Sequence, residues 1–286
     1  MVQKSVLILG GSSFVGKNLL EQVPREWDIV ATYCNNSNFE EFCKDKDNVE
    51  AEKVDLLGEI NVSRDSFDVI IYIAANSDPK KSLENPEEDF KLNADGVEKI
   101  LEKVSCKKFI YFSSGAVMLE KDIPYTISKK AGEANVKRLA KEKGFDYIIL
   151  RLFEAFGPYS PERKIFRRIA EALEKGEKEF KIQGDGTNFV DPMYVEDTAR
   201  GVVAVVEGNE VNVTVDLCTG EPMTITQVAE SIGKIYNVDL SLSYEGEPVE
   251  KVTFKGNPVE MKKLFGFEKK ISFEEGIEKW RKRNLE

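Results

Sequence analysis

The feature that most constrains the fold is a regular alternation in the first half of the chain. Short runs of apolar, β-branched or aromatic residues alternate there with longer charged segments of helical period. This alternation is typical of βαβ units around a parallel sheet, whose buried strands read as continuous apolar runs. We therefore expect strands at Ser5–Leu9, Asp28–Tyr33, Val49–Val54, Val69–Ile73, Phe109–Phe112 and Tyr147–Arg151.

Helices are expected between these strands, at Val15–Val23, Glu87–Val104 and Tyr125–Lys143. After Gly157-Pro158 the strict alternation weakens, which indicates that a second lobe of mixed structure begins there. Its expected pieces are a turn at Gly184-Asp185-Gly186 and helices at Arg163–Lys175, Val195–Glu207, Thr226–Tyr236 and Ser272–Arg283.

Composition narrows the class of protein. The 286 residues are 41% hydrophobic and 32% charged, which fits a globular chain and excludes a disordered one. The net charge of -10, without any stretch rich in Lys and Arg, argues against a nucleic-acid partner. No apolar run approaches the roughly 18–20 residues of a membrane span, so we expect a cytoplasmic protein with no membrane partner.

The cysteine and histidine counts restrict the chemistry. The 4 cysteines are widely scattered without a Cys-x-x-Cys pair, and read as reduced thiols rather than as a disulfide framework. The chain has no histidine, which removes the commonest metal ligand and the commonest general base. Tyr, Lys, Asp, Glu and Cys remain for proton chemistry, and we expect no metal site.

A glycine-rich turn follows the first predicted strand. It runs from Gly10 to Gly16 and opens into an amphipathic helix, an arrangement that presents backbone N–H groups and a helix N-terminus to a pyrophosphate. Ser13 stands where this fingerprint usually has its middle glycine, so its φ must be negative. The alternative interpretation is a tight strand-to-helix connection without a ligand.

The end of the second predicted strand bears on which dinucleotide would bind. About twenty residues after the turn, such a site normally offers a carboxylate to the ribose of NAD or a basic residue to the phosphate of NADP. Here the sequence is Tyr33-Cys34-Asn35-Asn36, which has neither. The choice between NAD and NADP stays open, and the missing carboxylate slightly favours NADP.

Tyr125 and Lys129 lie four residues apart on a predicted helix, so their side chains share one face. A phenol with a pKa of about 10 must drop by roughly 3 units to work near neutrality, and a nearby ammonium stabilises the phenolate. Just upstream, Ser113 and Ser114 end a predicted strand at the sheet edge where open α/β folds bind ligands. The alternatives are that Tyr125 and Lys129 lie on a solvated helix face and that the two serines form an ordinary turn.

Taken in order, these motifs resemble the extended short-chain dehydrogenase/reductase family, in its branch of sugar-nucleotide epimerases, dehydratases and reductases of the UDP-glucose 4-epimerase type. The resemblance covers nearly the whole chain. Besides the motifs above, it rests on Asp55-Leu56, Ala74-Ala75, Asn85-Pro86, Asn93, Gly132-Glu133, Arg151-Leu152-Phe153, Gly157-Pro158, Gly184-Asp185-Gly186-Thr187, Tyr194-Val195-Glu196-Asp197, Gly220-Glu221-Pro222, Leu264-Phe265-Gly266-Phe267 and Glu275-Gly276.

The resemblance implies a Rossmann-type α/β fold, a doubly wound parallel sheet with a smaller mixed α/β substrate lobe. The dinucleotide-binding domain would span residues 1–155, with residues 188–210 returning to it. Residues 156–286 would form the substrate-binding lobe.

The resemblance also implies roles for individual residues. Tyr125 would be the proton-transferring acid/base, Lys129 would lower its pKa and hold the nicotinamide ribose, and Ser114 would hydrogen-bond the reacting substrate oxygen. Asn76 and Glu154 would also meet the substrate. The cofactor would be NAD or NADP, bound by Tyr125 and Lys129 together with Gly10, Ser12, Ser13, Phe14, Val15, Gly16, Tyr33, Asp55, Leu56, Ala74, Ala75, Asn93, Ser113 and Phe153.

Several positions depart from the family pattern. Met118 stands where a tyrosine is common, Glu154 where asparagine is common, and Val190 where an arginine often holds the diphosphate. Because a carboxylate repels a diphosphate, either nearby basic residues compensate or the substrate lacks that group. The basic residues in question are Arg163, Lys164, Arg167 and Arg168. The alternative to a ligand contact is that they form an exposed helix face.

We interpret the sequence as an enzyme that moves a hydride between a nicotinamide and a carbinol or ketone carbon, while Tyr125 transfers the proton. The expected reaction is epimerisation of a nucleotide-activated sugar, and NAD(P)H-dependent reduction of a keto-sugar of the dTDP-4-dehydrorhamnose type is the first alternative. The sequence also fits a non-catalytic dinucleotide-binding regulatory subunit or a dehydrogenase of apolar alcohols. Dehydration is disfavoured because Ser114-Gly115-Ala116 lacks the Asp-Glu pair of the dehydratases. Similar proteins commonly form homodimers through the helix that bears Tyr125 and the long helix before it.

Overall fold

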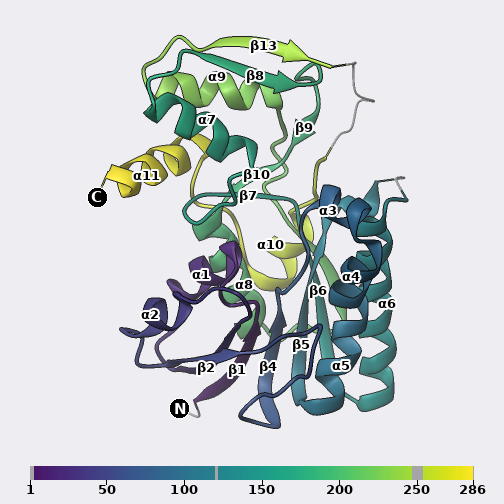
Figure 1. The fold of residues 1–286 in the computed structure, drawn as a ribbon. Coiled ribbons are helices and arrows are strands. Elements are labelled where there is room, and N and C mark those ends of the chain that lie inside the picture. Colours follow the sequence, from purple (N-terminus) through teal and green to yellow (C-terminus); the bar gives the residue numbers. More distant parts are fainter. Residues whose placement is uncertain (1–2, 120–121, 247–253, 286) are drawn as a thin grey trace.

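The computed structural model describes residues 3–119, 122–246 and 254–285. Its largest element is a sheet of seven parallel strands in the order β11-β6-β5-β4-β1-β2-β3 (Figure 1). The chain winds outward from the middle of this sheet in both directions, as in the predicted Rossmann-type fold. The strands are β1 Lys4–Leu9, β2 Trp27–Tyr33, β3 Val49–Lys53, β4 Ser66–Tyr72, β5 Ser105–Ser114, β6 Asp146–Leu152 and β11 Val213–Leu217.

Both faces of the sheet are buried, which is why its strands read as unbroken apolar runs. Along β1, Val6 and Ile8 pack into one core layer, whereas Leu7 and Leu9 pack into the other. The first layer lies under α1 Phe14–Leu20, α2 Phe39–Cys43 and α8 Val195–Glu207 (Figure 1). The helices on the opposite side are α3 Pro79–Glu84, α4 Pro86–Phe90, α5 Gly96–Lys103 and α6 Pro124–Lys143.

The helix predicted at Glu87–Val104 is not one regular α-helix. A π-helical turn at Lys91–Asp95 separates α4 from α5, and Val104 has left the helix in an extended conformation. The hydroxyls of Tyr72 and Tyr111 donate to the carbonyl oxygens of the second and third residues of this turn, at 2.7 and 2.6 Å. These hydrogen bonds from neighbouring strands satisfy carbonyl groups that would otherwise accept only backbone N–H groups of their own helix. The backbone hydrogen bonds of this segment change locally from the α-helical to the π-helical pattern.

The chain returns to the large sheet for longer than the sequence indicated. Residues 195–207 form α8 as predicted, and β11 then pairs in parallel with β6 although residues 213–217 fall in the range expected for the substrate lobe. The following α10 (Val259–Phe265) also packs on this layer through Met261. The sheet domain is therefore assembled from separate stretches of chain.

The small lobe lies over the carboxyl edge of the sheet (Figure 1). Its own core includes Phe156, Phe166 and Trp280. The three helices predicted here are confirmed, with ends shifted by one or two residues, as α7 Ile165–Glu174, α9 Ile225–Ile235 and α11 Phe273–Leu285. Sequence reasoning did not find the short strands β7 Glu154–Phe156, β8 Glu179–Gln183, β9 Phe189–Val190, β10 Pro192–Tyr194, β12 Met223–Thr224 and β13 Ser241–Glu245.

Among the helices that the structure describes, none combines the length and the apolar character needed to cross a membrane.

Candidate active site

A cavity of about 650 Å³ lies between the carboxyl edge of the sheet and the small lobe. Its walls come from the turn after β1, the ends of β4, β5 and β6, the start of α6, and the lobe residues around β7 and α9. Ten of the site residues predicted from the sequence line it, namely Ser13, Phe14, Val15, Ala75, Ser113, Ser114, Tyr125, Lys129, Phe153 and Glu154.

Tyr125 stands at the start of α6, directly after Pro124, whose fixed φ suits the first helical position. Its side chain is 9% exposed. Burial raises the pKa of Tyr125, a hydrogen bond with the Ser114 side chain lowers it, and the Asp89 carboxylate raises it again. The net shift is upward, so the phenol is protonated at neutral pH. Burial outweighs the other influences on this phenol, and the lowering of its pKa by Lys129 stays a prediction.

Lys129 follows one turn later on α6 and is 2% exposed. Its Nζ donates to the Phe112 carbonyl oxygen at 2.8 Å and lies 5.0 Å from the centroid of the Tyr111 ring. Burial lowers the pKa of Lys129 to about 7, although the carboxylates of Asp89 and Glu133 act to raise it. An amine that changes charge near neutrality, beside a buried phenol in one cavity wall, is typical of a site for proton transfer.

The two serines at the end of β5 have different partners. Ser113 donates to Glu133 Oε1 at 2.6 Å, and Arg151 binds both oxygens of the same carboxylate at 2.9 and 2.8 Å. Ser114 Oγ instead accepts the Ala116 N–H at 3.1 Å, which begins the 3-10 turn that follows β5. Of the two, Ser114 is the serine whose side chain hydrogen-bonds Tyr125, while Ser113 supports the ion pair between buried Glu133 and partly exposed Arg151.

One basic residue pairs with Glu154, the carboxylate that the family resemblance implies near the substrate. Lys164 Nζ lies 2.5 Å from Glu154 Oε1, and both residues line the cavity. Arg163 also lines it and donates to the Ser77 carbonyl oxygen at 3.0 Å, which joins the lobe to the sheet domain. The remaining two residues of the basic run lie on α7 outside the lining, Arg167 and Arg168.

Comparison with known proteins agrees with this geometry. The family model described as "NAD dependent epimerase/dehydratase family" matches residues 6–217. The chain belongs to this family. A UDP-glucuronate 4-epimerase of Thermodesulfobacterium geofontis (strain OPF15) is 30% identical to this chain over 246 residues. The aligned region covers 77% of this chain and 74% of that protein.

Solved structures show the same fold. A UDP-glucuronic acid 4-epimerase from Bacillus cereus, in complex with UDP-glucuronic acid and NAD, superposes with a TM-score of 0.87 at 20% identity, covering 99% of this chain and 100% of that one. RMD from Pseudomonas aeruginosa, complexed with NADPH, gives a TM-score of 0.80 at 19% identity, covering 98% and 99% of the two chains. At these identities the likeness establishes the Rossmann-type architecture of the family member.

The turn after β1 fits a nicotinamide dinucleotide. Gly10 has a φ of 87°, and a Cβ there would lie 2.7 Å from the Ala74 backbone nitrogen, so the turn needs glycine. Ser13 has the expected negative φ, -72°, and its Oγ accepts a backbone N–H from the first turn of α1 at 3.1 Å. The first N–H groups of a helix have no intrahelical partner, and Phe14 and Val15 of that turn line the cavity.

The rest of the predicted site residues lie outside the cavity lining. Leu56 is 6% exposed and packs in the core, and the Tyr33 hydroxyl bonds to Glu40. Gly10 and Ala74 instead shape the back of the turn. The complete set outside the lining is Gly10, Ser12, Gly16, Tyr33, Asp55, Leu56, Ala74, Asn76 and Asn93.

Sequence reasoning missed two residues next to the phenol and the amine. Asp89 and Ser128 are both fully buried and hydrogen-bond to each other at 2.5 Å. Asp89 ends the run Glu87-Glu88-Asp89, which reads as an acidic, solvated helix face. The available signal was its spacing of four residues from Asn93, which places both side chains on one helix face.

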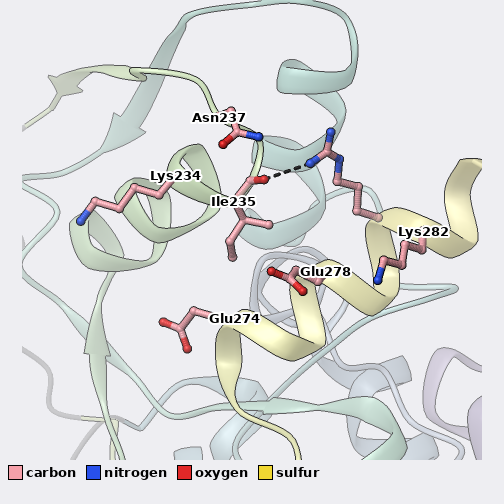
Figure 2. A pocket seen from close by; sticks show the side chains of 7 residues that line it. Lys234, Ile235, Asn237, Glu274, Glu278 and Lys282 are labelled. Carbon is pink, nitrogen blue, oxygen red and sulfur yellow. Dashed lines mark hydrogen bonds between the residues drawn. The ribbon is translucent and has the colours of Figure 1, made fainter.

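A second hollow, of about 610 Å³, lies between the end of α9 and α11 (Figure 2). It is lined by charges of both signs, such as Lys234 and Glu278, and Arg281 donates to the Ile235 carbonyl oxygen at 2.9 Å, capping the end of α9. None of the predicted site residues borders it. The cavity at the sheet edge is therefore the candidate active site of this family member.

The low pKa of Lys129 predicts how stability changes with pH. The pKa is about 7 in the folded protein and about 10.4 in an unfolded chain. Between these values the unfolded chain binds more protons, so the free energy of unfolding rises with pH. We expect urea unfolding of the cofactor-free protein to show this rise between about pH 7 and pH 9. Lys129→Met should lack it, whereas Lys130→Met, at an exposed neighbour, should retain it. Parallel pH profiles of the wild type and Lys129→Met would contradict the prediction.

Proposed function

We propose that this protein is an NAD(P)-dependent epimerase of sugar nucleotides. The observation that carries the proposal is that Tyr125, Lys129 and Ser114 line the same cavity as the first turn of α1. Acid/base groups and a pyrophosphate-binding turn thus border one space that is open to both a dinucleotide and a second ligand. Membership of the epimerase/dehydratase family supports this assignment, as does the relative named a UDP-glucuronate 4-epimerase.

When bound, a nicotinamide dinucleotide supplies the hydride acceptor and donor. The chain supplies the proton chemistry: Tyr125 in its phenolate form takes the proton of a sugar hydroxyl, and as the phenol it later returns that proton, while the Ser114 hydroxyl orients the sugar oxygen. Because burial raises the pKa of Tyr125, the phenolate needs a cation close by. Lys129 in the same wall is that cation, and it also holds the nicotinamide ribose.

The proposal assigns each part of the molecule a ligand. Residues 1–155 and 188–210 hold the dinucleotide, and residues 156–286 hold the sugar nucleotide, with Glu154 and its partner Lys164 at the boundary. We further propose a homodimer through the outer helices, where Leu83, Phe90 and Ile127 are 62%, 38% and 45% exposed. Large apolar side chains that stay exposed on α3, α4 and α6 favour such a contact.

Mass spectrometry of small molecules released from the purified protein tests this proposal. An epimerase regenerates its dinucleotide within each turnover, so we expect the protein to retain a dinucleotide when none is added. The strand end Tyr33-Cys34-Asn35-Asn36 favours NADP, and the released mass distinguishes it from NAD. Ser13→Asp is the matched variant: aspartate still caps α1, but its charge repels a pyrophosphate, so this variant should fold and carry none.

Different outcomes would point to different functions. Little bound dinucleotide, with turnover of a keto-sugar on addition of NADPH or NADH, would indicate a reductase. Bound dinucleotide without turnover of any UDP-sugar or dTDP-sugar would indicate a regulatory subunit. An oxidoreductase activity on alcohols that UDP and dTDP do not inhibit would indicate an enzyme for apolar substrates.

A further inference from the structure

Asp89 carries a buried carboxyl group that has no role in the proposed reaction. It lies on α4 and is 0% exposed. Its carboxylate accepts hydrogen bonds from Asn76 Nδ2 at 2.8 Å, Asn93 Nδ2 at 3.2 Å and Ser128 Oγ at 2.5 Å. All three donors are neutral, and no ion pair of Asp89 occurs within the described ranges. A carboxylate buried without a paired cation is costly, so its compensation has to come from another charge nearby.

The orientation of Asn93 fits an ionised Asp89. The Asn93 amide directs its N–H group at Asp89 and at Ser128 Oγ, the latter at 3.0 Å, while its own Oδ1 is buried and has no hydrogen-bond partner among the residues that the structure describes. An ionised carboxylate only accepts hydrogen bonds, whereas a protonated one could donate to that orphaned oxygen. The Asn93 amide therefore presents only hydrogen-bond donors to Asp89, as an ionised carboxylate requires.

This network reaches the candidate active site through α6, which lies beside α4 (Figure 1). Ser128 sits between Tyr125 and Lys129 in sequence, and its Oγ lies 3.0 Å from the Tyr125 carbonyl oxygen. The hydrogen bond from Ser128 thus fixes Asp89 against the same helical turn that carries the phenol and the amine. Asp89 acts to raise the pKa of both groups.

Lys129 needs a counter-charge as much as Asp89 does. Its Nζ donates to a neutral carbonyl oxygen, and no carboxylate lies within ion-pair distance of it among the residues that the structure describes. The second carboxylate that acts on Lys129 is Glu133, on the same helix. Glu133 is already neutralised, since Arg151 binds both of its oxygens. Asp89 is the carboxylate acting on Lys129 that has no such partner.

Among the described residues, the other titratable groups found to act on Tyr125 or to contact Lys129 are uncharged or already paired. From β5, the ring of Tyr111 lies under the ammonium, and burial raises its pKa well above the ordinary value, so it is uncharged. From the lobe side, Glu154 acts to raise the pKa of Tyr125 and Arg163 acts to lower it. Glu154 is paired with Lys164, and Arg163 Nε lies 3.2 Å from a carboxylate oxygen of Asp78.

We propose that Asp89 is a positioning residue whose buried carboxylate keeps Lys129 in its cationic form beside Tyr125. Its effect on turnover rests on the proposed function, whereas its effect on the charge of Lys129 does not. If Asp89 is neutralised, the cation in the cavity wall loses its counter-charge and gives up its proton at lower pH.

The test is a pH titration of the cofactor-free full chain by NMR with lysine labelled at Cε, in which the Lys129 signal is assigned by its loss in Lys129→Met. We expect Asp89→Asn to move the titration midpoint of Lys129 to lower pH by about one unit. Asp89→Glu, which keeps the charge, should restore most of the shift. Glu88→Gln, an exposed neighbour on the same helix, should leave the midpoint unchanged. Equal midpoints in the wild type and Asp89→Asn would overturn the proposal.

A double-mutant cycle covers the case in which Asp89→Asn does not fold alone. If the two buried charges compensate each other, adding Lys129→Met removes the unpaired cation, and the double variant should withstand more urea than Asp89→Asn. A double variant no more stable than Asp89→Asn would refute the coupling.

Turnover then separates this inference from the proposed function. In an active enzyme, Asp89→Asn should shift the pH profile of kcat in the same direction as the Lys129 midpoint. One possible result is that Asp89→Asn shifts the Lys129 midpoint although the wild type turns over no sugar nucleotide. This result would support the role of Asp89 while rejecting the epimerase assignment. An unchanged midpoint in an active enzyme would reject only the role of Asp89.

Discussion

Tyr125→Phe is expected to lower the turnover of a sugar nucleotide by about 10²- to 10⁴-fold, the range for loss of a positioned acid/base group. The phenol hydroxyl is the proton carrier of the proposed reaction, and the chain has no histidine that could replace it. The ring of phenylalanine still fills the same wall, so the cavity keeps its shape. Steady-state kinetics on UDP-sugars, together with dinucleotide affinity, measure the effect.

Tyr147→Phe is the matched control for this substitution. Tyr147 lies near the start of β6, at the opposite edge of the sheet from the cavity, and packs against the core. Its variant should keep wild-type turnover. Tyr125→Phe should also keep its dinucleotide affinity within a few-fold, because it loses a proton carrier and not the binding turn. Equal turnover in the wild type and Tyr125→Phe would remove the phenol from the mechanism.

Asp191→Ala is expected to produce the largest loss of stability, on the order of 3–4 kcal/mol in the free energy of unfolding. Asp191 is fully buried between β9 and β10. Its carboxylate accepts the backbone N–H and the hydroxyl of Thr219 at 2.8 and 2.5 Å, and the N–H groups of Gly220 and Gly256 at 2.9 and 3.2 Å. Alanine would leave these donors without their acceptor in a buried position.

Urea unfolding followed by circular dichroism measures this loss, with Asp239→Ala at an exposed position as the control. The segments that Asp191 joins also border the cavity: Phe254 packs on Phe153 with ring centroids 4.9 Å apart, and both rings line the wall. We therefore expect Asp191→Ala to weaken sugar-nucleotide binding as well. A loss of less than about 1 kcal/mol would show that different acceptors replace the carboxylate.

The parts of this fold that could be predicted are those governed by local pattern. The central strands are buried on both faces, so their apolar runs are unbroken, and the amphipathic helix Val195–Glu207 was predicted with its observed ends. Tyr125 and Lys129 line one cavity. This placement could be predicted because helical spacing alone puts two such side chains on one face. The family resemblance came from the order of these same local motifs.

The parts that escaped prediction depend on contacts distant in sequence. The π-helical turn at Lys91–Asp95 is set by tyrosines from β4 and β5, which leave no mark on the sequence of the helix. A strand as short as Phe189–Val190 has no period to detect. The upward pKa shift of Tyr125 follows from its burial, and Asp89 looks solvated until α6 is packed against it.

The late arrival of β11 has a consequence for how the protein is made. The sheet is completed only when residues 213–217 pair with β6, after α7 and β8 of the small lobe have left the ribosome. Until then one long side of β6 carries unpaired backbone groups, the kind of open edge on which nascent chains aggregate. Neither half of the molecule is a contiguous stretch of polypeptide, so we expect no single truncation to release either half as a separately folding fragment.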